Sequence, residues 1–395
     1  MRRPTFAALT SAAVLCLSTI ALAPSAGAAP GNSGPHRNVH VCASPAPGTA
    51  GCDAIRSDPS SASGQAAPMA AAPTGYGPAD IQSAYALAGL ASGGKTVAIV
   101  DAYNAPTAEA DLGVYRSQFG LPACTTANGC FKKVNQTGGT GSLPRNDGGW
   151  AQEISLDLDM VSAACPDCKI LLVEAKTSSF ANLATAVNTA AKMGAVAISN
   201  SYGGSDTTSY ASSYDHPGIA ITASTGDNGY GVSAPASFPG VVAVGGTSLT
   251  KDSSARGWSE AAWNGAGSGC STKNAKPSYQ TSATACGMKA TADVSAVADP
   301  NTGVAVYDSY AYQGYSGWMK FGGTSASSPI IASVYALGTA ATGSYPAAYT
   351  WAHAGQLNDV TTGSNGACTT TVWCSSGSGW DGPTGLGTPN GVSAF

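Results

Sequence analysis

The sequence predicts an α/β fold in which one mostly parallel sheet carries helices on both faces and forms a single domain. Two observations lead to this prediction. Short apolar runs rich in β-forming residues alternate with helical patterns along residues 76–395, and such alternation is typical of parallel sheets connected by helices. The runs are also almost continuously apolar, as strands buried on both faces must be.

The predicted elements follow in chain order. Strands are expected at residues 96–101, 169–174, 195–200, 218–224 and 241–246. Helices are expected at residues 78–90, 107–119, 150–164, 180–194 and 326–341. The region 252–322 and the tail after residue 343 are rich in loop-forming residues and are predicted to be mostly loops.

The first residues predict export. The chain starts with MRR, continues with an apolar stretch to about residue 23, and reaches AGA at residues 26–28. This pattern is typical of a secretory signal peptide, here residues 1–28. A transmembrane anchor is the alternative, but no stop-transfer pattern follows, and no later segment is long and apolar enough to span a bilayer. We therefore expect a secreted protein without a membrane partner.

Residues 29–75 are rich in Ala, Pro, Ser and Gly and show no sustained apolar period. Such composition is typical of a linker or a short pro-segment, with one small cystine loop at most. The predicted domain organisation is therefore a signal peptide at 1–28, this segment at 29–75, and one domain at 76–395.

The cysteines predict a set of local disulfides. Cys16 leaves with the signal peptide, so ten of the 11 cysteines remain, and an even number in an exported chain favours disulfides. The C-x-x-C pair could also be a redox or zinc motif, but a single such pair favours a structural loop. The expected pairs are Cys42/Cys52, Cys124/Cys130, Cys165/Cys168, Cys270/Cys286 and Cys368/Cys374.

The charge of the chain excludes some classes of partner. Charged residues make up 10% of the chain and the formal net charge is −4, whereas soluble domains usually carry about 25% charged residues. Nothing here predicts binding to nucleic acid or to an anionic membrane. The low charge is consistent with tolerance of acid. We expect a monomer.

A serine is the first candidate catalytic residue. Ser325 lies in the run GTSASSP at residues 323–329, which leads into an apolar segment and places its hydroxyl at the start of a helix. Backbone N–H groups at that point favour a developing oxyanion. The base is expected to be a carboxylate, and the chemistry to run at acid pH, because the four histidines lie in no recognisable catalytic context. They are His36, His40, His216 and His353.

Glu153 and Asp157 are one turn apart on the predicted helix 150–164, so their side chains lie side by side. One interpretation is an exposed acidic face. The other is a pair that shares a proton, because carboxylates held close together do not both ionise readily. Glu153 would then accept the proton of Ser325, and Asp157 would orient it. Asp159 does not lie on the side of the helix that carries Glu153 and Asp157, and it is expected at the surface.

Asp227 is the third candidate carboxylate. It lies in the run STGDNG at residues 224–229, just past a predicted strand, where the active sites of parallel sheets lie. The run Gly-Asp-Asn-Gly alone is a common turn. Together with the other motifs it makes Asp227 a candidate oxyanion donor, which requires a protonated carboxyl group.

These motifs, in this order, resemble the sedolisin (serine-carboxyl peptidase) family. They are E-x-x-x-D at residues 153–157, GD at 226–227 and GGTSASSP at 322–329, and the runs VAVGGT at 242–247, WSE at 258–260 and DVSAVADP at 293–300 agree. The resemblance implies a subtilisin-like fold and acid endopeptidase activity on protein or peptide substrates. It assigns Ser325 as nucleophile, Glu153 as base, Asp157 as its partner and Asp227 at the oxyanion hole.

The resemblance also implies one structural Ca²⁺ near the C-terminus. Two aspartates and a glycine-rich loop supply carboxylate and carbonyl oxygens, which calcium prefers. A turn and a loop without an ion are the alternative. The implied ligands are Asp359, Val360, Gly377, Gly379 and Asp381.

Two features depart from the family. Its members usually carry a large folded pro-domain, and residues 29–75 are too few for one. Asp101 ends the predicted strand 96–101 as in Ser-His-Asp subtilisins, so a subtilisin-type serine peptidase is one alternative, although the histidine-bearing helix of that group is absent. Asp101 could add a hydrogen bond near Glu153 or Asp157. The other alternative is a catalytically silent, exported binding protein on the same scaffold.

Overall fold

The computed structural model describes residue 1 and residues 36–59, 72–338 and 345–395. Apart from residue 1, the predicted signal peptide at 1–28 lies outside the described residues. Within these described ranges, none of the helices combines the length and the apolar character that crossing a membrane requires.

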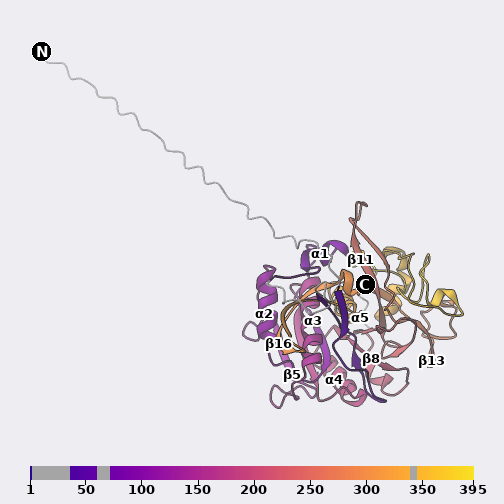
Figure 1. Cartoon of the computed structure of the whole chain (residues 1–395), viewed down its shortest axis with the longest axis horizontal. Coiled ribbons are helices and arrows are strands. Elements are labelled where there is room, and N and C mark those ends of the chain that lie inside the picture. The colour runs from indigo at the N-terminus through magenta and orange to yellow at the C-terminus, as the bar shows by residue number, and fades with distance from the viewer. Residues whose placement is uncertain (2–35, 60–71, 339–344) are drawn as a thin grey trace.

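An eight-stranded sheet forms the centre of the fold (Figure 1). Its strands are β4 (Thr96–Ala102), β5 (Phe131–Asn135), β6 (Lys169–Ala175), β7 (Ala197–Asn200), β9 (Ala220–Ser224), β11 (Val242–Lys251), β12 (Trp258–Ala262) and β15 (Val294–Val297). The order is β12-β11-β9-β7-β4-β6-β5, and β15 also pairs with β11. All pairings are parallel except that of β11 with β12. The predicted mostly parallel sheet is confirmed.

Helices cover both faces of this sheet, as predicted. Those of the described residues are α1 (Pro78–Ala84), α2 (Ala108–Gln118), α3 (Gly148–Ala164), α4 (Phe180–Lys192), α5 (Thr324–Leu337) and α6 (Pro346–Ala352). The helices α3 and α5 pack against each other and against β4, and α4 packs against β4 and β6. Asp147 caps α3 by accepting a hydrogen bond from Trp150 N, because the first N–H groups of a helix lack partners within it. This packing brings the middle of α3 to the start of α5.

The element ends differ from the predicted ones for local reasons. The helix α1 stops at Ala84 rather than at residue 90, since Ala86 already has a φ of 53°, in the left-handed region. The helix α5 ends at Leu337, and residues 339–341 of the prediction lie outside the described residues. The strand β11 runs on to Lys251 because its second half pairs with β12.

The prediction that residues 252–322 are mostly loops is wrong. Besides β12 and β15, this region holds β13 (Gly269–Ala275), β14 (Met288–Thr291), β16 (Val304–Tyr312) and β17 (Tyr315–Gly322). The strands β13, β16 and β17 are only partly buried. Polar and apolar residues therefore mix in them, and the continuous apolar signal is missing.

The segment 29–75, predicted as a linker or pro-segment, takes part in the fold where it is described. Residues 36–59 form β1 (His36–His40), β2 (Gly51–Cys52) and β3 (Ile55–Pro59). The strand β2 pairs with β8 (Tyr202–Ser205), which also pairs with β10 (Ser233–Ala234), and β3 pairs with β1 and β17. In Figure 1 this indigo segment lies across the middle of the domain, beside α5 and β8. Pairing through the backbone requires no apolar period, which explains why these strands were not predicted.

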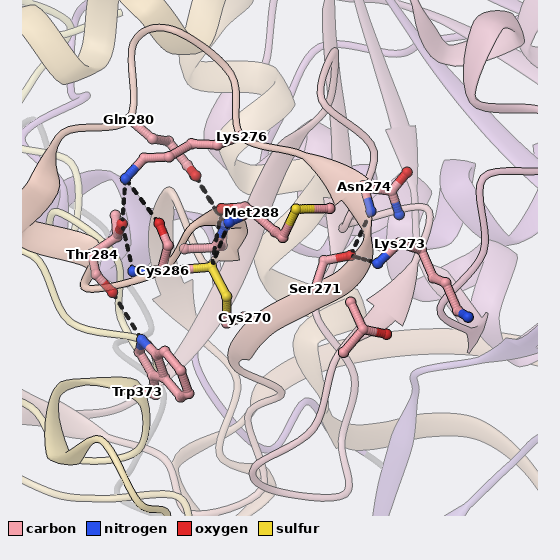
Figure 2. Close-up of a disulfide and its surroundings, with 12 residues drawn as sticks. Cys270, Ser271, Lys273, Asn274, Lys276, Gln280, Thr284, Cys286, Met288 and Trp373 are labelled. Carbon is pink, nitrogen blue, oxygen red and sulfur yellow. Dashed lines mark hydrogen bonds between the residues drawn. A yellow bond between two sulfur atoms is a disulfide. The ribbon is translucent and has the colours of Figure 1, made fainter.

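All five predicted disulfides are present: Cys42–Cys52, Cys124–Cys130, Cys165–Cys168, Cys270–Cys286 and Cys368–Cys374. The C-x-x-C pair is thus a disulfide and not a metal or redox dithiol site in this state. Figure 2 shows the loop closed by Cys270–Cys286, in which the Lys276 ammonium donates to Thr284 Oγ1 and to the Cys286 carbonyl. Trp373 Nε1 donates to the Thr284 carbonyl over 2.8 Å, so this loop is tied to the C-terminal region.

A buried ion pair supports the edge of the sheet. Lys289 Nζ lies 2.6 Å from Asp293 Oδ2, and neither side chain is exposed. Burial lowers the pKa of Lys289, while the charge of Asp293 acts in the opposite direction. Asp293 also accepts hydrogen bonds from Ala243 N, Gln280 Nε2 and Trp351 Nε1. The aspartate therefore joins three segments of the chain.

The substitution Lys289→Met is expected to lower the free energy of unfolding by about 3–5 kcal/mol, because it leaves the buried Asp293 carboxylate without its cation. Urea unfolding followed by tryptophan fluorescence measures this. Lys251→Met is the matched control: Lys251 pairs with Asp80 over 2.7 Å, but its side chain is 57% exposed, so a change below about 1 kcal/mol is expected. Equal effects of the two substitutions would contradict the prediction.

Candidate active site

The two main candidate residues meet where α3 faces the start of α5. Ser325 Oγ donates a hydrogen bond to Glu153 Oε2 over 2.9 Å, and it also lies 3.2 Å from the Ser201 carbonyl oxygen. Both side chains are completely buried. The serine is the second residue of α5, and the glutamate lies in the middle of α3. The structure thus places the predicted nucleophile in hydrogen-bond contact with the predicted base.

Asp157 continues this chain of contacts. Its Oδ1 accepts a hydrogen bond from Ser201 Oγ over 2.8 Å, while its Oδ2 and Oε1 of Glu153, one helical turn away, are buried without a hydrogen-bond partner. Both carboxyl groups are 0% exposed, so the alternative of an exposed acidic face is wrong. Burial raises the pKa of Glu153 well above its usual range, and the charges of Asp157 and Asp101 raise it further. Burial also raises the pKa of Asp157, followed by the charge of Asp101. The pair is therefore built to hold a proton.

Asp227 follows β9 and approaches the other side of the serine. Its Oδ1 accepts hydrogen bonds from Thr324 N over 2.7 Å and from Thr324 Oγ1 over 2.8 Å, whereas its Oδ2 is buried without a partner. Burial raises the pKa of Asp227 well above the usual range, and the charge of Asp53 adds to this. A protonated Asp227 would carry its proton on Oδ2 and have it free to donate.

Gly323 lies beside this free oxygen of Asp227. A β-carbon at this residue would lie 2.5 Å from Asp227 Oδ2 and 2.0 Å from the carbonyl oxygen of Asp53. Both oxygens therefore gather beside the backbone of Gly323, immediately before the helix that carries Ser325. The residue has a φ of 95°, a conformation that glycine alone adopts readily. Close approach and backbone conformation both require a glycine here.

Asp53 is a residue of the site that the sequence analysis missed. Its carbonyl oxygen accepts a hydrogen bond from Ser325 N over 3.2 Å, and its Oδ2 accepts one from Ser224 Oγ over 2.7 Å. Burial raises the pKa of Asp53 to about 7. It comes from the segment predicted as a linker, where the only sign of order was the Cys42/Cys52 pair. Ser201, Ser224 and Thr324 were missed as well, because single hydroxyl residues carry no sequence signal.

Two further aspartates differ from the predictions. Asp101 is completely buried at the end of β4, but neither of its oxygens has a hydrogen-bond partner, so the expected hydrogen bond to Glu153 or Asp157 is not formed. Instead, the charge of Asp101 raises the pKa of Glu153 and the pKa of Asp157. Asp159 was expected at the surface and is 1% exposed. Its Oδ2 accepts a hydrogen bond from Tyr307 N over 3.0 Å, which holds α3 against β16.

The serine has a carboxylate rather than a histidine as its partner. Of the four histidines, His216 hydrogen-bonds to Asn188 and His353 to the Tyr349 carbonyl. Ser325 Oγ makes its hydrogen bonds to Glu153 and to the Ser201 carbonyl. The geometry thus disfavours a subtilisin-type Ser-His-Asp triad.

The residues implied for calcium converge in the C-terminal region. Gly379 N donates to Asp359 Oδ2 over 2.9 Å, and Gly377 N donates to Asp381 Oδ2 over 3.2 Å, so the loop 377–381 folds against Asp359. Asp381 is 1% exposed, and burial raises its pKa to about 7. The loop thus connects the buried carboxyl of Asp381 with the exposed one of Asp359. Carboxylate oxygens and the carbonyl oxygens of such a loop are hard donors, and such a set fits Ca²⁺.

Comparison with known proteins places these features in a family context. Residues 139–371 match the model of the subtilase family. The chain is 29% identical over 370 residues to kumamolisin of Bacillus sp. (strain MN-32), which covers 83% of the chain and 64% of that protein. It is 34% identical over 176 residues to sedolisin of Pseudomonas sp. (strain 101), which covers 40% of the chain and 29% of that protein. The chain therefore spans less than two thirds of the length of either relative.

A solved structure has a similar fold over most of the chain. It is Pseudomonas sedolisin (serine-carboxyl proteinase) complexed with two molecules of pseudo-iodotyrostatin, with a TM-score of 0.68 and 25% sequence identity. The match covers 80% of this chain and 96% of that one.

The unpartnered carboxyl of Asp101 predicts how stability depends on pH. Burial raises the pKa of Asp101 well above its usual range, and the charge of Glu174 raises it further. The folded state thus binds this proton more tightly than the unfolded state, and stability is lost as the pH rises above the unfolded pKa. Asp101→Asn is expected to raise the free energy of unfolding at pH 7.5 by about 1 kcal/mol or more, and to change it far less at pH 3.5.

Urea unfolding at the two pH values measures this difference. Asp252→Asn is the control with the opposite sign, because hydrogen bonds from Ser254 lower the pKa of this exposed aspartate. A carboxylate with a lowered pKa adds stability above its unfolded pKa, so removing it lowers stability at pH 7.5. A benefit of Asp101→Asn that is larger at pH 3.5 than at pH 7.5 would refute the assignment of a raised pKa.

Proposed function

Because the chain belongs to the subtilase family and, within it, to the sedolisins, we propose that it is a secreted serine-carboxyl endopeptidase that acts at acid pH. The observation that carries this proposal is the hydrogen bond of 2.9 Å from Ser325 Oγ to the buried Glu153. A serine hydroxyl is a weak nucleophile until a neighbouring base takes its proton. Here the base is a carboxylate in a buried network.

Acylation follows from this contact. Ser325 Oγ attacks the carbonyl carbon of the peptide bond, and its proton passes to Glu153. Asp157 lies one helical turn from Glu153 and is itself held by Ser201, so it supports the base and helps to hold the transferred proton. Glu153 then gives the proton to the leaving amine. Water attacks the resulting acyl-enzyme in the second half of the reaction, with Glu153 again as the base.

The oxyanion is stabilised by two donors on the opposite side of Ser325. One is the backbone N–H of Ser325 and the other is the protonated carboxyl of Asp227. The lone Oδ2 of Asp227 and the nearby peptide oxygen of Asp53 support this role. Donors fixed in advance in a site without water are worth roughly 3–4 kcal/mol each. Since Asp227 donates only when it is protonated, the proposed activity declines as the pH rises above its pKa.

We propose protein or peptide chains as substrates and a monomer as the working form. The five disulfides support export, since disulfides persist in oxidising compartments. A silent binding protein would have no need of a nucleophile, a base and an oxyanion donor placed together, and the assay below separates it from an enzyme.

We also propose that one Ca²⁺ binds at the C-terminal loops, where it would stabilise the fold. Asp359 and Asp381 would supply carboxylate oxygens, and Val360, Gly377 and Gly379 would supply carbonyl oxygens. The charge of the ion would offset the cost of burying Asp381.

Removal of calcium is expected to lower the thermal unfolding midpoint by several degrees, because an ion that binds only the folded chain stabilises it. Differential scanning fluorimetry of the Ser325→Ala protein, with EDTA and then with excess Ca²⁺, measures this. Asp381→Asn should abolish the response, while Asp167→Asn, in the Cys165–Cys168 loop, should retain it. Identical midpoints with EDTA and with Ca²⁺ would refute the site.

The proposed mechanism predicts the effect of removing the nucleophile. Ser325→Ala should lower kcat/KM on acid-denatured haemoglobin by about 10³-fold or more, and Glu153→Gln should do the same. Ser327→Ala is the matched control, because this buried serine of the same helix donates only to the Ala296 and Val297 carbonyls. Activity across pH 3 to 8 should be highest in acid. A maximum at pH 8 would contradict the proposed carboxyl donor.

A further inference from the structure

Two buried carboxyl groups lie side by side at the ends of β4 and β6. Asp101 and Glu174 are register partners on these parallel strands, so their side chains point to the same face of the sheet, on strands about 4.8 Å apart. Both residues are 0% exposed, and neither oxygen of Asp101 nor Oε2 of Glu174 has a hydrogen-bond partner. The proposed reaction uses neither group directly.

Lys133 brings a positive charge to this pair. It lies on β5, the other neighbour of β6, and its Nζ is 3.6 Å from Glu174 Oε1. The ammonium donates to Asn104 Oδ1 and to the Ala105 carbonyl over 2.8 Å each, and Ala105 N donates to Glu174 Oε1 over 3.0 Å. The Lys133 side chain is only 17% exposed. Its charge is therefore held in one place and is less screened than a surface charge.

The pair belongs to an acidic cluster that reaches the active site. The cluster consists of Glu174, Asp101, Asp157 and Glu153. The charge of Glu174 raises the pKa of Asp101, and the charge of Asp101 raises the pKa of Asp157 and of Glu153. Among the residues that the structure describes, Lys133 forms the only ion pair with a member of this cluster.

The other charged or titratable groups packed here do not take the place of Lys133. The charge of Arg116 acts on Asp159, which is turned to β16 by its hydrogen bond from Tyr307 N. Burial raises the pKa of Tyr202 well above its usual range, so this group stays neutral in acid. Asp53 adds a carboxyl group whose charge raises the pKa of Glu153. The remaining charged side chains of β5, β6 and α4 are exposed lysines, namely Lys132, Lys169 and Lys192.

We propose that the charge of Lys133, acting across Glu174 and Asp101, makes Glu153 available as a base at acid pH. This inference rests on the proposed function. Lys133 is a positioning residue rather than a catalytic one, because its contacts are to Glu174 and to the loop after β4.

The physical reason is the cost of ionising a carboxyl group among others. Glu153 accepts the proton of Ser325 only after the cluster has released one of its own protons. A fixed positive charge favours the ionised form of every carboxyl group near it. Burial raises the pKa of Glu174 to about 7, so in acid this group is protonated and does not neutralise the ammonium. The charge of Lys133 then acts on Asp101, two strands away at about 10 Å, and on the groups beyond it.

The pH dependence of kcat/KM on acid-denatured haemoglobin tests the proposal. Lys133→Met is expected to move the acid limb, where activity falls as Glu153 becomes protonated, to higher pH by about half a unit or more. The alkaline limb, assigned to Asp227, should stay in place. Lys133→Arg retains the charge and should restore the acid limb of the wild type. Lys132→Met is the matched control, because this neighbouring lysine is exposed, and its profile should equal that of the wild type.

Several results would overturn the proposal. Activity of Lys133→Met that is lower at every pH, without a shift of the acid limb, would show that Lys133 only holds the loop after β4. A shift that Lys133→Arg does not reverse would show that the charge is not the cause. If Lys133→Met does not fold, Lys133→Gln replaces it with the same expected shift, since Gln removes the charge but keeps a donor for the loop.

The same assay separates this proposal from the proposed function. A wild-type protein that is active in acid, with an acid limb that neither uncharged variant moves, would overturn the role of Lys133 and leave the serine-carboxyl peptidase standing. A folded wild-type protein without Ser325-dependent hydrolysis at any pH would overturn both.

Discussion

Burial of several carboxyl groups around one serine is the constraint on which the rest of the structure depends. Glu153, Asp157, Asp227 and Asp101 have little or no exposure, and burial is the largest cause of the raised pKa of each. Isolated buried carboxylates are too costly to keep ionised, so the cluster is stable only when it holds protons. Acid conditions thus favour both the fold and the proposed chemistry, because both depend on protons bound to these buried carboxyl groups.

The N-terminal segment adds one more carboxyl group to this buried cluster. Asp53 brings another carboxyl group into the same buried space, and its charge is among the causes that raise the pKa of Glu153 and of Asp227. Asp53 therefore strengthens the hold of this cluster on its protons.

The sequence was sufficient to predict the sheet and most of the site, since each rests on a local pattern. Continuous apolar runs located the parallel strands β4, β6, β7, β9 and β11, although the parallel strands β5 and β15 were missed. The one-turn spacing placed Glu153 beside Asp157, and close sequential cysteines predicted the disulfides. The strands β13, β14, β16 and β17 were missed because they are only partly buried, so their sequences lack that pattern. Asp53 was missed for a different reason. Its place depends on backbone pairing with β8 and β17, which are distant in sequence, and such pairing requires no particular side chains.

Asp53 covers the serine through contacts of its own backbone. The segment is held by the same backbone contacts that would hold a substrate, with the Ser201 carbonyl and the Ser325 N–H on either side of one residue. A cover bound in this way cannot shield the serine without presenting a peptide bond to it. The pairing of β1 with β3 holds the segment in place on both sides of Asp53. The lifetime of the covered state is therefore set by a few short strands rather than by a folded domain.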